Sequence, residues 1–324
     1  MADSIVYLNG EYLPEAEALV PVTERGFFGG DGVYEVTRTF AGKLFRLDAH
    51  LKRLYRSLAY IRVDAGFDST QMGAITEETL RRNLERLGPG ADFALWHVVA
   101  RADSVHGNPE GKPPGPIISI FCVETDFAHY ADAYLRGMRL LTPGIRRTPA
   151  DSIDPKAKVL SRMNQIQAAL EVAENDPGAV PLLLDRDGNI TETNTGNFFF
   201  VANGKLMTSS PRGVLGGVTR AAVLEIAAKL GIETVEGDFT PYDIYAADEA
   251  FVTSTSPVIL PVKSLNGNRI GGDGDGTLPG PVTLKLMRAF IDLAGMDFVA
   301  QALEMLSANE AADSLAEWRA RLAD

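Results

Sequence analysis

The chain has 324 residues, of which 45% are hydrophobic and 23% charged, and its formal net charge is −12. This length suffices for about two domains with buried cores, and the composition is typical of a soluble globular protein. The acidic excess tells against binding to duplex nucleic acid, which requires a basic surface. Cys122 is the one cysteine, so no intrachain disulfide can form and we expect a reducing, cytoplasmic environment.

Signals for export, membrane insertion and metal binding are lacking in the sequence. The first residues, Met1 to Ser4, have neither the basic nor the apolar region of a signal peptide. No apolar run is long enough to span a bilayer, so we expect no membrane partner. The four histidines are scattered along the chain, and we therefore expect no metal site.

Short β-rich segments and helical segments alternate in the first part of the chain. Strands are expected at 5–8, 11–13, 33–40, 43–47, 94–101 and 116–124. Leucines recur at helical spacing after Asp48, which is therefore expected to cap a helix, and a second helix is expected over 77–87. The Gly/Pro-dense loop 106–115 is typical of a binding loop, although a plain hairpin connection explains its composition as well.

The second part of the chain has its own set of strands and helices. Strands are expected at 139–142, 180–184 and 197–201, and helices at 161–174, 219–230 and 281–293. Two such blocks indicate two α+β domains. We interpret 1–125 as a small N-terminal domain, 126–138 as an interdomain linker, 139–295 as a large C-terminal domain and 296–324 as an added helical tail.

Several segments, taken together and in order, resemble the class IV aminotransferases. They are Arg25–Glu35, His50–Leu54, Asp154–Lys158 with Met163–Asn164, Ile190–Phe198, Leu215–Arg220 and Asp248–Thr255. The family includes D-amino-acid, (R)-amine and branched-chain transaminases and aminodeoxychorismate lyase. The resemblance implies a two-domain α+β fold of the D-amino-acid-aminotransferase type (fold type IV), with pyridoxal 5'-phosphate (PLP) in the interdomain cleft of a homodimer.

The resemblance also assigns roles at the cofactor. Local sequence does not separate Lys156 from Lys158, but the family pattern makes Lys158 the catalytic lysine that forms a Schiff base with PLP. Glu192 matches the carboxylate that keeps the ring nitrogen protonated. The remaining expected cofactor contacts are the phosphate-binding Arg53, Val218, Thr219 and Thr255, and Leu215 packed against the ring.

The substrate residues are less closely matched to any one branch of the family. Tyr34 is similar to a tyrosine that helps to hold the substrate carboxylate in the D-amino-acid enzymes, and Trp96 is a further candidate. The arginine that those enzymes carry in the following loop is missing, so Arg101, His106 and Lys112 are the candidate cations. Met163 stands where the branched-chain enzymes have a tyrosine.

The second half of the chain is most similar to the (R)-amine transaminases. We therefore expect a transaminase that uses a D-amino acid or (R)-amine as donor and an α-keto acid such as pyruvate or 2-oxoglutarate as acceptor. The first alternative is an L-branched-chain aminotransferase, and the second is a lyase of the aminodeoxychorismate type. A non-catalytic binding protein on the same fold is a further alternative, although a pure binder has no need of a Schiff-base lysine.

Overall fold

The computed structural model describes residues 4–87, 92–102, 115–271 and 277–323. The chain forms two compact units. Unit 1 comprises Met1–Thr125 with Ala157–Arg162, and unit 2 comprises Asp126–Lys156 with Met163–Asp324. Residues 157–162, which the predicted division assigns to the large second domain, therefore group with unit 1.

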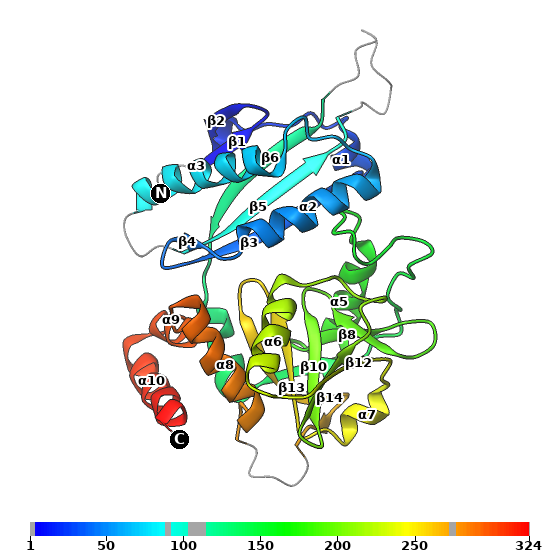
Figure 1. The fold of residues 1–324 in the computed structure, drawn as a ribbon, viewed down its shortest axis with the longest axis vertical. Coiled ribbons are helices and arrows are strands. Elements are labelled where there is room, and N and C mark those ends of the chain that lie inside the picture. The colour runs from blue at the N-terminus through cyan, green and yellow to red at the C-terminus, as the bar shows by residue number, and fades with distance from the viewer. Residues whose placement is uncertain (1–3, 88–91, 103–114, 272–276, 324) are drawn as a thin grey trace. The chain divides into compact units, whose positions relative to one another are not determined.

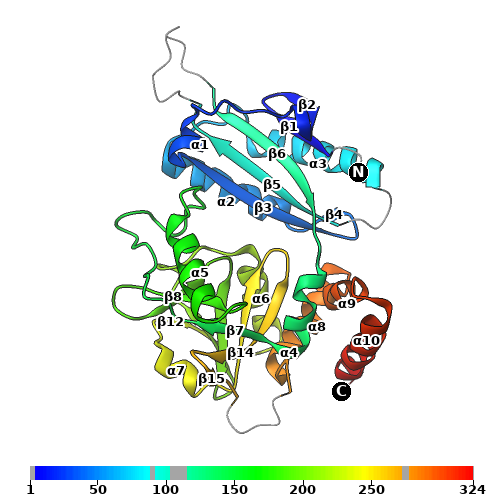
Figure 2. The same cartoon turned by 180° about the vertical axis from the view of Figure 1, so that it is seen from behind.

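Unit 1 is built on an antiparallel sheet in the order β2-β1-β6-β5-β3-β4 (Figures 1 and 2). The strands are β1 (Ile5–Leu8), β2 (Glu11–Pro14), β3 (Gly32–Phe40), β4 (Lys43–Leu44), β5 (Phe93–Ala100) and β6 (Ile117–Glu124). Asn9 and Gly10 both have positive φ, as a tight turn between β1 and β2 requires. These bounds confirm the predicted strands, except that β4 ends at Leu44.

Helices α2 (Leu47–Ile61) and α3 (Ser69–Leu87) cover one face of this sheet (Figure 1). Leucines 51, 54 and 58 of α2 are buried in the core, as their helical spacing predicts. The prediction that Asp48 caps α2 is wrong, because the helix already begins at Leu47. Asp48 lies in the first turn, where its charge is favourable for the helix dipole.

Unit 1 also contains two short helices, and its helix α3 begins earlier than predicted. The 3₁₀ helix η1 (Glu15–Glu17) and helix α1 (Arg25–Gly29) lie between β2 and β3. Helix α3 begins at Ser69 rather than at residue 77. The carboxylate of Asp68 accepts hydrogen bonds from the backbone N–H groups of Thr70 and Gln71, which satisfies donors of the first turn.

Unit 2 contains a mixed sheet in the order β12-β11-β10-β13-β14-β7-β8-β9, with β15 paired to β14. The strands are β7 (Met138–Leu141), β8 (Val180–Leu184), β9 (Ile190–Thr193), β10 (Asn197–Ala202), β11 (Lys205–Ser209), β12 (Thr234–Gly237), β13 (Glu249–Ser254), β14 (Val258–Leu265) and β15 (Asn268–Arg269). Because β9 pairs with both β8 and β10, the strands from β10 through β14 and β7 to β9 form a closed circle. This closure brings Glu192 opposite Asn197.

The predicted strands at 139–142, 180–184 and 197–201 are confirmed as β7, β8 and β10. Strand β9 lies between β8 and β10 in the sheet, so the latter two are not direct partners. Strands β9 and β11 to β15 have no counterpart among the predicted elements. The apolar side chains of the closed circle form the core of the unit, among them Leu182, Phe198 and Val252.

The helices of unit 2 agree with the predictions at 161–174, 219–230 and 281–293 to within two residues. They are α4 (Ala131–Arg136), α5 (Met163–Asn175), α6 (Val218–Lys229), α7 (Pro241–Tyr245), α8 (Pro281–Ala294), α9 (Phe298–Glu304) and α10 (Ala308–Ala323), with the 3₁₀ helix η2 (Ala128–Tyr130). The predicted linker, 126–138, instead contains η2 and α4. Tyr134 of α4 is buried and donates its hydroxyl to the carbonyl of Pro257 at 2.7 Å.

The C-terminal segment packs into unit 2 through helices α9 and α10. Trp318 of α10 is fully buried and donates its indole N–H to Asp297 Oδ2 at 2.9 Å. The other oxygen of Asp297 accepts from the N–H groups of Val299 and Ala300 at the start of α9. One aspartate therefore caps α9 and fixes α10.

Candidate active site

Lys158 lies on a short extended segment that runs beside β3 of unit 1. Its carbonyl accepts a hydrogen bond from the N–H of Tyr34 at 2.9 Å, and the N–H of Leu160 donates to the carbonyl of Gly32 at 2.9 Å. A Cβ on Gly32 would lie 2.7 Å from Leu160 Cδ1 and 2.8 Å from the carbonyl oxygen of Val99. The missing side chain at Gly32 therefore lets the lysine segment pack directly on the strand.

The amine of Lys158 lies against an aromatic surface. Its Nζ is 4.4 Å from the centre of the Tyr34 ring, within the range of cation–π attraction. The Tyr34 ring stacks on Trp96 with centroids 5.7 Å apart, and Trp96 stacks in turn on Phe121. The structure thus brings Tyr34 and Trp96, both predicted substrate residues, together with Lys158. Lys156, the competing lysine, is exposed.

Arg53 is held by a buried carboxylate, that of Glu35. Glu35 is fully buried and accepts from Arg53 Nε at 2.8 Å and Nη2 at 2.6 Å, and its Oε1 lies 3.1 Å from His50 Nδ1. Burial opposes the charge on Glu35. The Arg53 guanidinium outweighs this cost and holds the pKa of Glu35 well below its usual value. Burial lowers the pKa of His50, although Glu35 opposes this effect.

Helix α2 connects this ion pair to the lysine segment. The hydroxyl of Ser57 donates to the carbonyl of Arg53 at 3.0 Å and accepts from the N–H of Lys158 at 3.1 Å. Ser57 is itself buried. The backbone of Lys158 is therefore fixed by β3 on one side and by α2 on the other.

Arg101, a predicted substrate residue, makes structural contacts in unit 1. Its Nε donates to Asp31 Oδ2 at 3.0 Å, and its Nη2 donates to the carbonyl of Ile61 at 2.6 Å, at the end of α2. These bonds tie the first motif to that helix, so a role in substrate binding stays a prediction. The other candidate cations, His106 and Lys112, lie outside the described residues.

Glu192 of unit 2 has a carboxylate that accepts hydrogen bonds from three different segments. Its Oε1 accepts from Arg147 Nε at 3.0 Å, while its Oε2 accepts from the N–H of Leu215 at 3.0 Å and from Asn197 Nδ2 at 3.2 Å. Several donors on one carboxylate suit a charged acceptor. Gly217 leaves room for this arrangement, since a Cβ there would lie 2.1 Å from Asn197 Oδ1.

The start of α6 gathers the predicted phosphate contacts of unit 2. Gly217 precedes the helix, and the N–H groups of its first turn, which include Val218 and Thr219, have no partners within the helix. Such a turn favours anions. Thr219 donates its hydroxyl to the carbonyl of Ser254 at 3.1 Å, which brings the turn beside the residue that precedes Thr255. Leu215 is half-buried, as suits a side chain that also packs against a ligand.

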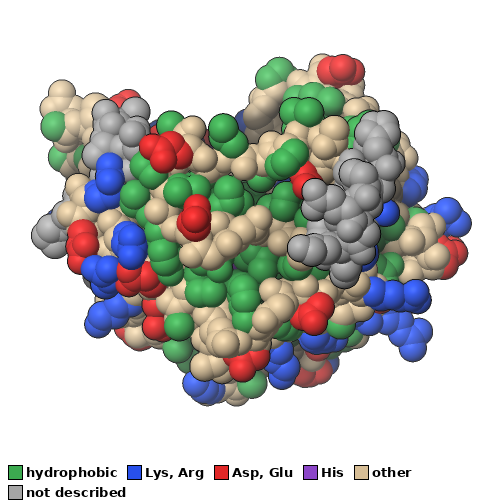
Figure 3. Space-filling model, turned by 90° about the horizontal axis from the view of Figure 1, so that it is seen from above, with side chains coloured by type: hydrophobic (Ala, Val, Ile, Leu, Met, Phe, Trp, Pro, Cys, Tyr) green, Lys and Arg blue, Asp and Glu red, His purple; other side chains and the backbone are tan. Residues whose placement is uncertain are grey.

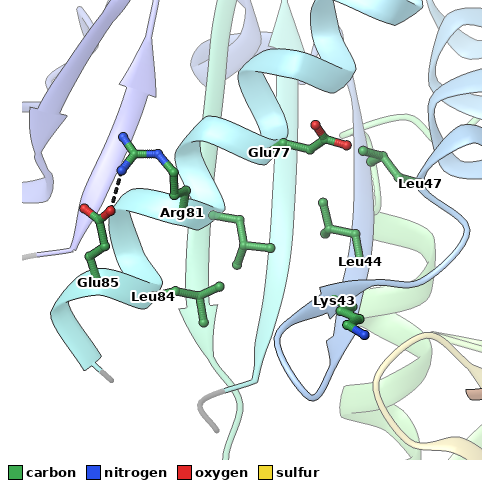
Figure 4. A pocket seen from close by; sticks show the side chains of 8 residues that line it. Lys43, Leu44, Leu47, Glu77, Arg81, Leu84 and Glu85 are labelled. Carbon is green, nitrogen blue, oxygen red and sulfur yellow. Dashed lines mark hydrogen bonds and ion pairs between the residues drawn. The ribbon is translucent and has the colours of Figure 1, made fainter. Parts of the chain in front are cut away.

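A groove on unit 1 has a different character. Its volume is about 550 Å³, and it is lined by leucines of β4 and α3 together with the ion-paired Arg81 and Glu85 (Figure 4). None of the predicted site residues lines this groove.

Among the described residues, no group of three His, Cys, Asp or Glu is arranged to hold a metal ion.

Comparison with known proteins identifies the family. A family model described as amino-transferase class IV matches residues 32–265. A protein of Methanocaldococcus jannaschii with the provisional name of a branched-chain-amino-acid aminotransferase is 34% identical over 290 residues, which cover 89% of this chain and 96% of that protein. The D-alanine aminotransferase of Bacillus licheniformis is 28% identical over 88% of this chain and 95% of its own length.

The chain belongs to the class IV aminotransferase family.

Solved aminotransferase structures have the same fold. The branched-chain enzyme of Escherichia coli superposes with a TM-score of 0.81 at 25% identity, covering 90% of this chain and 94% of its own. The branched-chain enzyme of Thermoproteus uzoniensis, solved with norvaline, superposes with a TM-score of 0.80 at 26% identity, covering 94% of this chain and 99% of its own. Family, fold type and enzyme class are therefore confirmed. Class IV aminotransferases use PLP, so this protein is a PLP-dependent aminotransferase, as predicted.

Each unit, taken by itself, has side chains whose chemistry suits this cofactor. Unit 1 has the amine of Lys158, and unit 2 has the buried carboxylate of Glu192 and the first turn of α6. When bound, PLP supplies an aldehyde that combines with amines and a ring that withdraws electrons from the substrate α-carbon.

Within the described part of the chain, no helix has both the length and the apolar character needed to cross a membrane.

Glu35, Arg147 and Asn197 are candidate site residues that sequence reasoning missed. The sequence signal for Glu35 is its place as a charged residue within the predicted strand 33–40, which the structure shows to be buried along its whole length. Asn197 lies within a recognised motif. Arg147 carried no local signal, because its contact with Glu192 depends on tertiary structure.

Proposed function

We propose that this aminotransferase transfers the amino group of a D-amino acid or an (R)-amine to an α-keto acid such as pyruvate or 2-oxoglutarate. The observation that carries the proposal is the position of Tyr34, whose ring lies beside the amine of Lys158 and stacks on Trp96. In the D-amino-acid enzymes that the first motif resembles, this tyrosine helps to hold the substrate carboxylate. The relationship to the D-alanine aminotransferase of Bacillus licheniformis supports the same choice.

Each candidate residue has one role in this proposal. Lys158 would hold the cofactor through its amine and would move the proton of the donor's α-carbon. Glu192 holds a proton on the ring nitrogen, and Leu215 packs against the ring. Arg53, Thr255 and the first turn of α6 at Val218 and Thr219 bind the phosphate. Tyr34 and Trp96 contact the substrate, for which Arg101 and His106 remain the candidate cations.

L-Branched-chain transamination is the second candidate. The greater identity to the Methanocaldococcus jannaschii protein and the structural likeness to branched-chain enzymes favour it. Met163 tells against it, because the branched-chain enzymes have a tyrosine at this position. The third alternative, a lyase, needs no keto-acid acceptor and is disfavoured by relatives that are named as aminotransferases.

The visible absorption of the PLP-loaded enzyme separates these candidates. D-Alanine, (R)-1-phenylethylamine and L-leucine are added separately, without any keto acid. Loss of the lysine-bound cofactor band with D-alanine or the (R)-amine, but not with L-leucine, supports the proposal. Loss with L-leucine alone overturns it in favour of the branched-chain reaction. Lys158→Ala should show no turnover with any donor, and near-normal turnover would remove Lys158 from its role.

Tyr34→Phe tests the observation that carries the proposal. The variant keeps the ring that stacks on Trp96 and removes only the hydroxyl. We expect the KM for D-alanine to rise about tenfold or more, because a hydrogen bond to a carboxylate is lost. The KM for (R)-1-phenylethylamine, which has no carboxylate, should change little. Equal effects on both donors would contradict a role of the hydroxyl in holding the carboxylate.

We also propose that the enzyme is a homodimer. Phe27 and Phe28 of unit 1 are 73% and 74% exposed, and Met163, Ile166 and Leu170 form an exposed apolar row along α5 of unit 2. Such apolar surfaces are typical of interfaces. One face of the molecule shows hydrophobic side chains gathered at its centre, with Lys and Arg toward its edges (Figure 3). Sedimentation equilibrium of the wild type and of Phe27→Ser/Phe28→Ser tests this, since a monomeric wild type would contradict it.

The cytoplasmic location that we propose is supported by the single thiol. Cys122 is free and buried, and burial raises its pKa to about 12, so the thiolate is scarce at neutral pH. A protein with no disulfide suits a reducing compartment. Fractionation of the cells that make the enzyme tests this location, and recovery outside the cytoplasm would overturn it.

A further inference from the structure

Arg147 is a buried cation to which the proposed function gives no role. It lies in the segment between β7 and α5 of unit 2. Its N–H donates to the carbonyl of Leu184 at the end of β8, at 2.8 Å. The residues on either side are held as well, because Asn164 Nδ2 donates to the carbonyl of Arg146 and Asn164 Oδ1 accepts from the N–H of Thr148. The backbone of Arg147 is thus held by hydrogen bonds that do not involve its side chain.

The side chain of Arg147 is directed at Glu192. Nε donates to Oε1 at 3.0 Å, and the side chains are only 10% and 8% exposed. A pair this buried has few water molecules to replace a lost partner, so removing the arginine leaves an uncompensated charge. The remaining donors to Glu192, Leu215 N–H and Asn197 Nδ2, are both neutral and both bind the other oxygen. Among the described residues, Arg147 is therefore the cationic partner of this carboxylate and the side chain that donates to Oε1.

A carboxylate that keeps a ring nitrogen protonated must stay charged and must keep its orientation. We propose that Arg147 is a positioning residue that acts on PLP through Glu192, by holding the carboxylate in a fixed orientation toward the ring nitrogen. This inference rests on the proposed role of Glu192. It differs from a purely structural role, in which Arg147 would only fix the segment before α5.

A double-mutant cycle on cofactor affinity distinguishes these two roles. The Kd of the apoenzyme for PLP is measured by fluorescence for the wild type, Arg147→Met, Glu192→Gln and the double variant. We expect Arg147→Met to weaken PLP binding by about tenfold to a hundredfold, the range for a hydrogen bond to a charged group. In the Glu192→Gln background the same substitution should have little further effect. If the fold-change in Kd of the double variant equals the product of the fold-changes of the two single variants, the proposal is overturned.

A cofactor analogue gives a second readout that does not depend on activity. In 1-deaza-PLP a carbon replaces the pyridine nitrogen, so Glu192 has no ring proton to hold. Arg147→Met should therefore weaken binding of PLP much more than binding of the analogue. An equal loss for both ligands would show a structural role and overturn the proposal. Arg147→Lys keeps the charge and should recover most of the PLP affinity.

Controls separate this inference from the proposed function. Arg139→Met removes an ion pair with Asp176 in the same unit, in which Glu192 takes no part, and should leave the Kd unchanged. If Arg147→Met does not fold, Arg147→Gln, which also removes the charge, replaces it in both experiments. If Glu192→Gln leaves PLP affinity unchanged, the ring-nitrogen assignment fails and the inference fails with it. An effect of Glu192→Gln without any effect of Arg147→Met overturns the inference alone.

Discussion

The buried carboxylate of Glu35 fixes the position of the Arg53 side chain in unit 1. It is fully buried, yet it remains charged because Arg53 donates to both of its oxygens. The strand fixes Glu35, and Glu35 in turn fixes the Arg53 guanidinium. Arg53, the proposed phosphate ligand, is thereby oriented in the absence of the cofactor, which lowers the entropic cost of binding.

Glu35→Gln should destabilise unit 1. The amide has nearly the same shape but no charge, so the largely buried Arg53 loses its charge–charge interaction with Glu35. We expect the free energy of unfolding to fall by about 3–5 kcal/mol, measured by urea denaturation. Glu78→Gln, at an exposed ion pair of α3, serves as the control and should change stability little. Equal losses in the two variants would contradict the importance of the buried pair.

Gly217→Ala should weaken cofactor binding through Asn197. The backbone at Gly217 has φ −63° and ψ 135°, which alanine adopts freely, so the effect is steric rather than conformational. The new Cβ would displace Asn197, a donor to Glu192. We expect the Kd for PLP to rise about tenfold, measured by fluorescence titration of the apoenzyme. At Gly213 the nearest atom to an added Cβ is 3.6 Å away, so Gly213→Ala should bind PLP normally.

At the scale of elements, hydrophobic periodicity predicted the helices and strands whose pattern is visible in the local sequence. Leucines at helical spacing predicted α2, because that spacing requires one buried face, and alternating β-branched residues predicted β3, of which all nine residues are buried. The strand circle of unit 2 could not be predicted in this way. Its closing pair, β9 with β10, depends on contacts between segments that are distant in sequence, and β9 is only four residues long. Motif resemblance, rather than pattern, marked Glu192 and Thr219.

The tail shows the limit of composition as a guide. Residues 296–324 are rich in alanine and charge and were predicted only to be helical, yet Trp318 is fully buried and bonded to Asp297. Trp318→Ala should lower the free energy of unfolding of unit 2 by about 3–5 kcal/mol, since a large buried side chain is lost. Circular dichroism during urea denaturation measures this. Arg319→Ala, at the exposed next position, should change stability little, and equal effects would refute a structural tail.

At the scale of the whole molecule, the two units can be observed separately. The chain has two tryptophans, Trp96 in unit 1 and Trp318 in unit 2. Their fluorescence therefore reports the unfolding of different units, and Trp318→Phe leaves a probe of unit 1 alone. This matters because two units need not unfold in one transition, and a single free energy would then have no clear meaning.

Unit 1 should lose stability in mild acid because of a buried histidine. His97 is fully buried, and burial lowers its pKa to about 4. The hydroxyl of Thr76 donates to the carbonyl of Met72, so its oxygen accepts from His97 Nε2, and Nδ1 has no partner among the described residues. A proton on Nδ1 would therefore be buried without an acceptor. The unfolded chain binds this proton near pH 6.5, whereas the folded unit binds it only near pH 4.

Stability is therefore full above about pH 6.5 and falls as the pH decreases toward 4, since the unfolded state binds more protons over this interval. We expect a loss of roughly 2–3 kcal/mol between pH 7 and pH 4.5, measured by urea denaturation with Trp96 fluorescence in the Trp318→Phe background. The pKa of Glu35 is also depressed, but a depressed carboxyl costs stability only below its ordinary value of 4.5, outside this window. His97→Gln should flatten the pH dependence, while His129→Gln, at an exposed position, should not. If both variants keep the wild-type slope, the loss does not arise from His97. Buried His50, whose pKa is also lowered, would then be the next residue to substitute.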